Sequence, residues 1–191
     1  MKKELRIPPF LHDVFGEKQH IGSIIAVLFF GVLLTGALLW RSPEMIQSLP
    51  LWRSILACIL IFDIFAGCIA NFTVSTNNFY AARSTNRIVF ISIHVHIVLI
   101  ALLLGVNVEH SIVVWAYTII GAFIVNSLIR KQSQLFIAGL LLSIGLGLLP
   151  LLPNLHSYML TTCILFMIKV LFSFAVDHYG SKPFHKVGDD T

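Results

Sequence analysis

The chain of 191 residues is 57% hydrophobic and only 12% charged, with a formal net charge of +4 at pH 7. Ordinary soluble domains carry roughly 25% charged residues, so this composition excludes a soluble globular protein and indicates an integral membrane protein. The positive charge is explained by membrane topology and by attraction to anionic lipid, so it gives no reason to expect nucleic acid as a partner. The three cysteines all fall in apolar runs, which excludes a disulfide framework and a zinc site.

The apolar runs, taken in chain order, predict six transmembrane helices. A hydrocarbon core about 30 Å thick needs about 20 helical residues to cross it. Runs of that length occur at 21–40, 51–72, 87–106, 111–129, 134–153 and 157–176. The connections are too short for another domain. We therefore expect an all-α fold: one polytopic helical bundle over 21–176, an N-terminal segment at 1–20 and a C-terminal tail at 177–191.

Lys and Arg are distributed unevenly among the short connections, and cytoplasmic loops retain positive charge. One set of connections is flanked only by Arg41 and Arg53. The other set, with the termini, carries Lys2, Lys3, Arg6, Lys18, Arg83, Arg87, Arg130, Lys131, Lys182 and Lys186. Both termini are therefore expected to be cytoplasmic, as an even number of spans requires. The compact chain, without an extracellular domain, favours a multi-pass protein of a bacterial plasma membrane.

The N-terminal segment carries an apolar stripe at helical spacing after a double proline. The stripe consists of Phe10, Leu11, Val14 and Phe15. It predicts a short helix lying on the cytoplasmic surface of the membrane. A disordered tail with a few exposed apolar side chains is the alternative.

The connection at 73–87 reads TVSTNNFYAARSTNR and is unusually rich in Ser, Thr and Asn. Hydroxyl, amide and guanidinium groups bind phosphate oxygens. A lipid headgroup or a phosphorylated solute could therefore dock on Tyr80, Arg83 and Arg87. The same residue types also form solvated turns with capping side chains, and this alternative stays open.

Small residues recur every four positions in the fifth span, at Gly139, Ser143 and Gly147. This pattern lets helix backbones approach closely, so we expect it to serve helix packing. The first three spans share no residue pattern with the last three. The sequence therefore lacks the internal repeat that marks many transporters.

Several ionisable residues fall inside the predicted spans, where each costs at least about 2.5 kcal/mol and needs a partner, a wet cavity or a function. At about 1.5 Å per residue, Asp63 and Lys169 lie at about the same depth, near the middle of the membrane. His94 and His96 fall in the same layer. Asp63 and Lys169 are therefore candidates for an intramembrane ion pair.

Helical periodicity extends this polar region along two spans. Asp63, Gly67 and Asn71 share one face of the second span. On the sixth span, Lys169, Ser173 and Asp177 form a similar stripe, which His178 follows. We expect the two faces to point inward, toward each other, with the polar interior opening toward the cytoplasm.

His94 and His96 are two residues apart, so on a continuous helix they point about 200° apart. Chelation of one metal ion from one helix needs a spacing of three or four, so no metal site is predicted there. One histidine should face the polar interior, and the other should pack against a neighbouring helix or Ser92. The flanking residues favour His94 as the inward one.

Three functions could use this cluster. We favour transport of a small solute or proton, in which the ion pair breaks and re-forms while a histidine relays the proton. The alternative is an intramembrane enzyme acting on a lipid or isoprenoid, and a further one is a structural or regulatory subunit whose polar residues hold helices together. The expected partners are membrane lipids, a small solute or proton and a second copy of the chain. No cofactor is expected, and a metal or haem is the least favoured addition.

Overall fold

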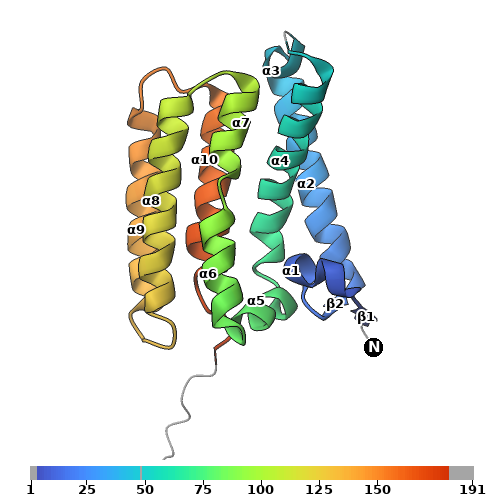
Figure 1. The fold of residues 1–191 in the computed structure, drawn as a ribbon, viewed down its shortest axis with the longest axis vertical. Coiled ribbons are helices and arrows are strands. Elements are labelled where there is room, and N and C mark those ends of the chain that lie inside the picture. Colours follow the sequence, from blue (N-terminus) through green and yellow to red (C-terminus); the bar gives the residue numbers. More distant parts are fainter. Residues whose placement is uncertain (1–3, 48, 181–191) are drawn as a thin grey trace, which may run out of the picture.

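The computed structural model describes residues 4–47 and 49–180 of the chain. It is a bundle of long helices with short elements at both ends (Figure 1). The predicted all-α membrane fold is confirmed, because among the described residues six helices are long and apolar enough to cross a membrane. These spans are Ile21–Arg41 (α2), Leu51–Ala70 (α4), Ser84–Leu104 (α6 and α7), Val108–Ser127 (α8), Gln134–Leu151 (α9 and η2) and Ser157–Phe174 (α10 and η3).

The last span is the central one, since 61% of its residues are buried, whereas α2 and the fifth span are 22% buried. In Figure 1, α2 and α4 stand on one side, α8 and α9 stand on the other, and α7 and α10 lie between them. Helix α4 packs on α2 and also contacts α7, α10 and η3, while α8 contacts α7, α9 and η3. Residues of α4 and of the sixth span therefore face one another inside the bundle.

The third and sixth spans both depart from regular α-helix. The third consists of α6 (Ser84–Ile93) and α7 (His96–Leu104), with two non-helical residues between them. The sixth begins as α10 (Ser157–Met167) and continues as a π-helix, η3 (Ile168–Phe174). The irregular parts of both spans contain residues of the predicted polar cluster.

Two short elements mark the ends of the bundle. Helix α3 (Glu44–Gln47) follows α2 at one end, and α5 (Val74–Ala81) follows α4 at the other, so we call these the α3 end and the α5 end. Among the described Lys and Arg residues counted for orientation, Arg41 and Arg53 lie at the α3 end, and the others lie at the α5 end: Arg6, Lys18, Arg83, Arg87, Arg130 and Lys131. The other four residues of that count and most of the predicted tail lie outside the described residues: Lys2, Lys3, Lys182, Lys186 and 181–191.

The segment 73–87 is not a solvated turn, so that interpretation of the sequence is wrong. It contains α5 and the start of α6, and the Thr73 hydroxyl caps α5 by accepting the N–H of Thr76 at 3.4 Å. Four of its side chains are buried against the bundle: Thr76, Asn77, Tyr80 and Arg87. Burial of these polar groups obliges them to find partners inside the protein.

The N-terminal segment folds onto the α5 end rather than lying alone on a surface. A two-stranded antiparallel hairpin, β1 (Glu4–Arg6) with β2 (Lys18–His20), encloses η1 (Pro9–Leu11) and the four-residue α1 (His12–Phe15). The predicted apolar stripe is divided, since Phe15 is 9% exposed and Phe10 is 80% exposed. Gly16, at φ +70°, ends α1 against Ser75 of α5, where a β-carbon would overlap the Ser75 backbone.

The predicted packing role of Gly139 and Gly147 is wrong within the chain. A β-carbon added at either position would meet nothing within 4 Å, so both glycines face away from the bundle. Gly145 instead lies against Met167 and Tyr117. The four-residue pattern therefore lies on the outer face of α9 (Gln134–Leu148), and Gly145 lies on the packed face.

Candidate intramembrane polar site

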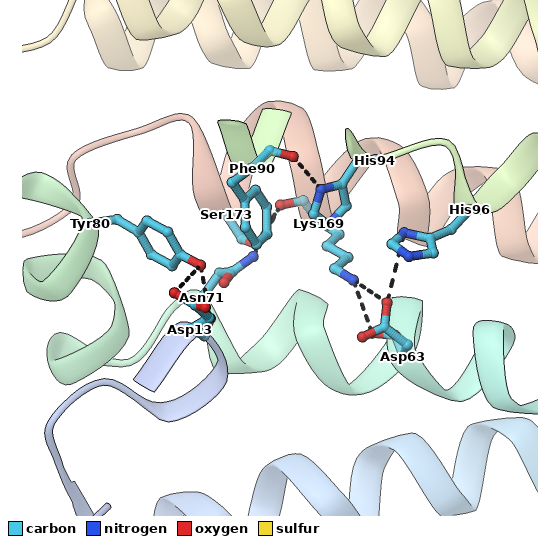
Figure 2. Close-up of polar contacts among 9 residues, drawn as sticks. All are labelled: Asp13, Asp63, Asn71, Tyr80, Phe90, His94, His96, Lys169 and Ser173. Carbon is cyan, nitrogen blue, oxygen red and sulfur yellow. Dashed lines mark hydrogen bonds and ion pairs between the residues drawn. The ribbon is translucent and has the colours of Figure 1, made fainter. Parts of the chain in front are cut away.

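The ion pair that the sequence predicts between Asp63 and Lys169 is present. Lys169 Nζ lies 2.6 Å from Asp63 Oδ2 and also donates to the Asp63 backbone carbonyl at 3.2 Å (Figure 2). The two side chains differ in exposure: that of Lys169 is 4% exposed and that of Asp63 is 46% exposed. The cation is thus enclosed by protein, and the carboxylate forms the open side of the pair.

Gly67 makes this approach possible. It lies one turn after Asp63 on α4, and a β-carbon there would come 2.5 Å from Lys169 Cε and 2.9 Å from Nζ. The lysine side chain therefore rests on a helix surface that has no side chain at this point. Only glycine allows this contact without displacing the ammonium group.

His96 is the histidine closer to the Asp63 carboxylate, whereas His94, which the sequence favours as the inward histidine, is the more deeply buried of the two. The Nδ1 atom of His96 is 3.9 Å from Asp63 Oδ2, and no hydrogen bond to another described residue satisfies it. His94 is 3% exposed and packs against Phe90, while Ser92 bonds to its own helix at Ile88. His96 is therefore the histidine whose ring nitrogen lies nearest to the Asp63 carboxylate.

The interruption of the third span explains why both histidines are near the pair. The His94 N–H bonds to the Ile91 carbonyl, so the Phe90 carbonyl loses its usual helical donor. The His94 ring replaces that donor by giving its Nδ1 proton to Phe90 O (Figure 2). The two imidazole centroids are then 5.0 Å apart. The expected divergence of about 200° assumed an uninterrupted helix.

The π-helix η3 carries Lys169 and Ser173 of the predicted stripe. A π-helix bonds residues five apart, as in the 3.3 Å bond from Ala175 N to Val170 O, and such segments are frequent at functional sites. Lys169 O accepts the Ser173 hydroxyl at 3.1 Å and Asn71 Nδ2 at 3.5 Å. Asn71 and Ser173, expected as transport residues, therefore support the backbone that carries Lys169.

A set of buried side chains, the carbonyl-capping group, satisfies the last carbonyls of the sixth span. A helix end leaves carbonyls without backbone donors, and hydrocarbon supplies no water to replace them. Asn77 donates to Val176 O at 3.1 Å. Arg87 donates to Phe174 O at 3.2 Å and to Ala175 O at 2.8 Å. Gln134 also donates to Ala175 O, at 3.1 Å. Together with Asn71 they close the α5 end of the core.

Asp177 and His178 belong to this end of the bundle. The Asp177 N–H donates to Gln134 Oε1 at 3.2 Å. The His178 ring lies between Phe72 and Phe172 and contacts the Phe172 carbonyl through Nε2 at 3.2 Å. Burial lowers the pKa of His178 below its ordinary value. Both residues thus terminate the sixth span, beyond the ion pair.

The three residues expected at a headgroup site have separate surroundings. Tyr80 is 3% exposed and donates to Asp13 O at 3.1 Å, and burial together with the Asp13 charge raises the pKa of its hydroxyl. Arg87 is 1% exposed within the carbonyl-capping group and also donates to Asn126 at 2.9 Å. Arg83 remains near the surface, paired with Glu17 at 2.8 Å. No shared phosphate-binding surface is formed by Tyr80, Arg83 and Arg87.

Sequence reasoning missed three contributors to this region: the break after Ile93, Gln134 and Asn77. The break has no glycine or proline to announce it. Gln134 is the last polar residue of the QSQ stretch that precedes an apolar run, and Asn77 lies in the segment for which the sequence predicts a connection. A metal site is not indicated, since no three His, Cys, Asp or Glu side chains of the described residues are grouped to hold an ion. Comparisons with family models, curated proteins and solved structures find no match for the chain.

Proposed function

We propose that this protein is a proton-coupled membrane transporter and that the Asp63–Lys169 pair is its coupling site. The observation that supports this most is the position of the pair: two opposite charges 2.6 Å apart in the middle of two spans, with His96 at 3.9 Å. Ionisable groups persist in membrane spans when they pair with each other and lie on ion or proton pathways. A purely structural link between helices could be made at lower cost by hydroxyl or amide groups.

The mechanism follows from electrostatics. A proton bound by Asp63 removes the negative charge that holds the Lys169 ammonium, and the enclosed cation then requires another anion or must give up a proton. His96 can deliver that proton, because an imidazole ring can both accept and donate a proton and its Nδ1 atom lies 3.9 Å from Asp63 Oδ2. Protonation therefore switches the site from a closed pair to one that attracts a negatively charged group.

The two irregular spans provide the movement that transport requires. Transporter sites are commonly formed where membrane helices are interrupted, because those segments can change their backbone conformation. Here His96 directly follows the break between α6 and α7, and η3 carries Lys169. Both partners of Asp63 are thus attached to backbone that can adopt a second arrangement.

The proposal includes the orientation and the membrane. Clustering of Lys and Arg at the α5 end supports a cytoplasmic location for that end and for both termini. We place the protein in the plasma membrane of a bacterial cell. A protease added to intact cells should then leave tags at both termini uncut.

A pH jump on proteoliposomes adsorbed to a solid-supported membrane tests the coupling site without knowledge of the solute. A drop from pH 7.5 to 6.0 should give a transient current in the wild-type protein, as protons enter the site. Asp63→Asn should abolish the current, because the amide takes up no proton, and His96→Gln should slow its rise. Arg83→Gln, which alters a surface pair, is the matched control and should leave it unchanged. An undiminished current in a folded Asp63→Asn protein would overturn the proposal.

A further inference from the structure

A lateral hollow of about 530 Å³ lies between α4 and α7, on the α3 side of the ion pair. Its volume falls within the range of roughly 300–1,000 Å³ typical of ligand sites. Apolar side chains form nearly all of its wall: Trp52, Leu56, Ile59, Leu60, Leu99, Leu102 and Leu103. An occupant must therefore present a hydrocarbon surface to most of the hollow.

The outer end of the hollow carries one positive charge, that of Arg53. One of its Nη2 protons bonds to the Leu102 carbonyl at 2.7 Å, which satisfies a terminal carbonyl of α7 and fixes the guanidinium at the rim. A guanidinium has five N–H donors, and its other donors form no hydrogen bond with the described residues. An anionic headgroup can therefore bind there without breaking the existing contact.

The inner end of the hollow lies about one helical turn from the coupling site. Ile59 and Leu60 precede Asp63 by about one helical turn, and Leu99 follows His96 by about one turn. Asp63 is also the open member of its pair, at 46% side-chain exposure, whereas Lys169 is enclosed. Access from the α5 end is blocked by the carbonyl-capping group, whose side chains are buried and bonded to backbone. The exposed carboxylate and the neighbouring hollow together favour a lateral approach to the pair, from the lipid.

From these observations we infer that the solute is a single-chain anionic amphiphile that enters sideways between α4 and α7, with its headgroup at Arg53 and its chain along the hollow. This inference rests on the proposed function. Protonation of Asp63 would then free Lys169 to receive the anionic headgroup as it moves inward. No covalent step is involved, because the anion exchanges one ion pair for another.

Native mass spectrometry in mild detergent tests the site with two probes that share one lauroyl chain, lysophosphatidate and zwitterionic lysophosphatidylcholine. The wild-type protein should bind one molecule of lysophosphatidate, at least tenfold more tightly than lysophosphatidylcholine. Arg53→Gln should remove that preference while leaving the weaker, chain-dependent binding. Arg41→Gln, which removes the other arginine at the α3 end, is the matched control and should retain the preference for lysophosphatidate.

A second pair of variants tests the hollow itself. Leu99→Trp fills it and should weaken binding of both probes at least tenfold. Leu140→Trp places the same ring on α9 at a similar exposure, 46% against 41% for Leu99, and should bind like the wild-type protein. Equal binding of the two probes, or unchanged binding in Leu99→Trp, would overturn the inference. A dimer that Leu99→Trp dissociates would also overturn it, by assigning the hollow to a second copy of the chain.

The pH-jump current distinguishes failure of this inference from failure of the proposed function. If Asp63→Asn abolishes the current but the wild-type protein shows no headgroup preference, the coupling site stands and the solute class is wrong. If the headgroup preference depends on Arg53 but the current does not depend on Asp63, the hollow is a lipid site on a protein with another function. Both dependences together support the inference.

Discussion

The side chain of Lys169 crosses α4 at Gly67, and its Cε atom lies 2.5 Å from the point where a β-carbon of residue 67 would stand. The ion pair with Asp63 therefore depends on a missing side chain one turn away as much as on the two charges. This contact is specific to the native packing, since the two residues are far apart in the sequence.

Gly67→Ala should separate the ion pair. The methyl group overlaps the lysine side chain, and overpacking of this kind costs about 1–3 kcal/mol of unfolding free energy. Gly139→Ala has open space around it and should be neutral or slightly stabilising. Denaturant titration in detergent measures both. Equal stability of the two variants would contradict the packing described for Lys169.

Removing Asp63 should destabilise the protein more than removing Lys169. Asp63→Asn leaves an enclosed ammonium without a counter-ion and should cost about 3–5 kcal/mol. Lys169→Met should cost less, because the remaining carboxylate is half-exposed. The double variant should recover part of the loss, and a double-mutant cycle measures this coupling. Strict additivity of the two single substitutions would show that the pair contributes no coupling energy.

Arg87→Lys should destabilise the protein despite conserving the charge. The guanidinium bonds to Phe174 O, Ala175 O and Asn126 at once, and an ammonium group cannot match that planar fork. Leaving buried acceptors unsatisfied costs about 1–3 kcal/mol. Arg83→Lys is the control. Arg83 pairs with Glu17, donates to Phe79 O and lies over the Phe79 ring, but near the surface water can replace these contacts, and an exposed pair is worth about 0–1 kcal/mol. Thermal unfolding of the two variants side by side measures the difference.

His178 should lower the stability of the protein in acid. Burial depresses the pKa of the folded imidazole, whereas in the unfolded chain it takes up a proton near pH 6.5. The unfolded state therefore binds more protons below about pH 6.5, and stability falls as the pH drops through that value. His178→Phe keeps the aromatic contacts and should reduce this loss between pH 7.5 and 5.5. An identical pH profile in the variant would show that the histidine is not responsible.

The sequence by itself predicted the membrane class, the six spans and the meeting of Asp63 with Lys169. These properties depend on composition and helical geometry: an apolar run of about 20 residues has few alternatives to a membrane helix. Charges at equal depth must also find each other or water. Both constraints act through local sequence and simple distances, so they could be read without coordinates.

Only the tertiary structure decided which polar groups join the site and which support the backbone. The break that brings His96 to Asp63 contains no glycine or proline that would predict it. The ring of His94 replaces the lost backbone donor at Phe90, so the helix can be interrupted without such a residue. Asn71 donates to the Lys169 carbonyl, 98 residues away within the sixth span, and Arg87 donates to the Ala175 carbonyl, 88 residues away at the end of that span. Such bonds form because hydrocarbon offers no other partner, and a partner so distant in the sequence is selected by packing alone.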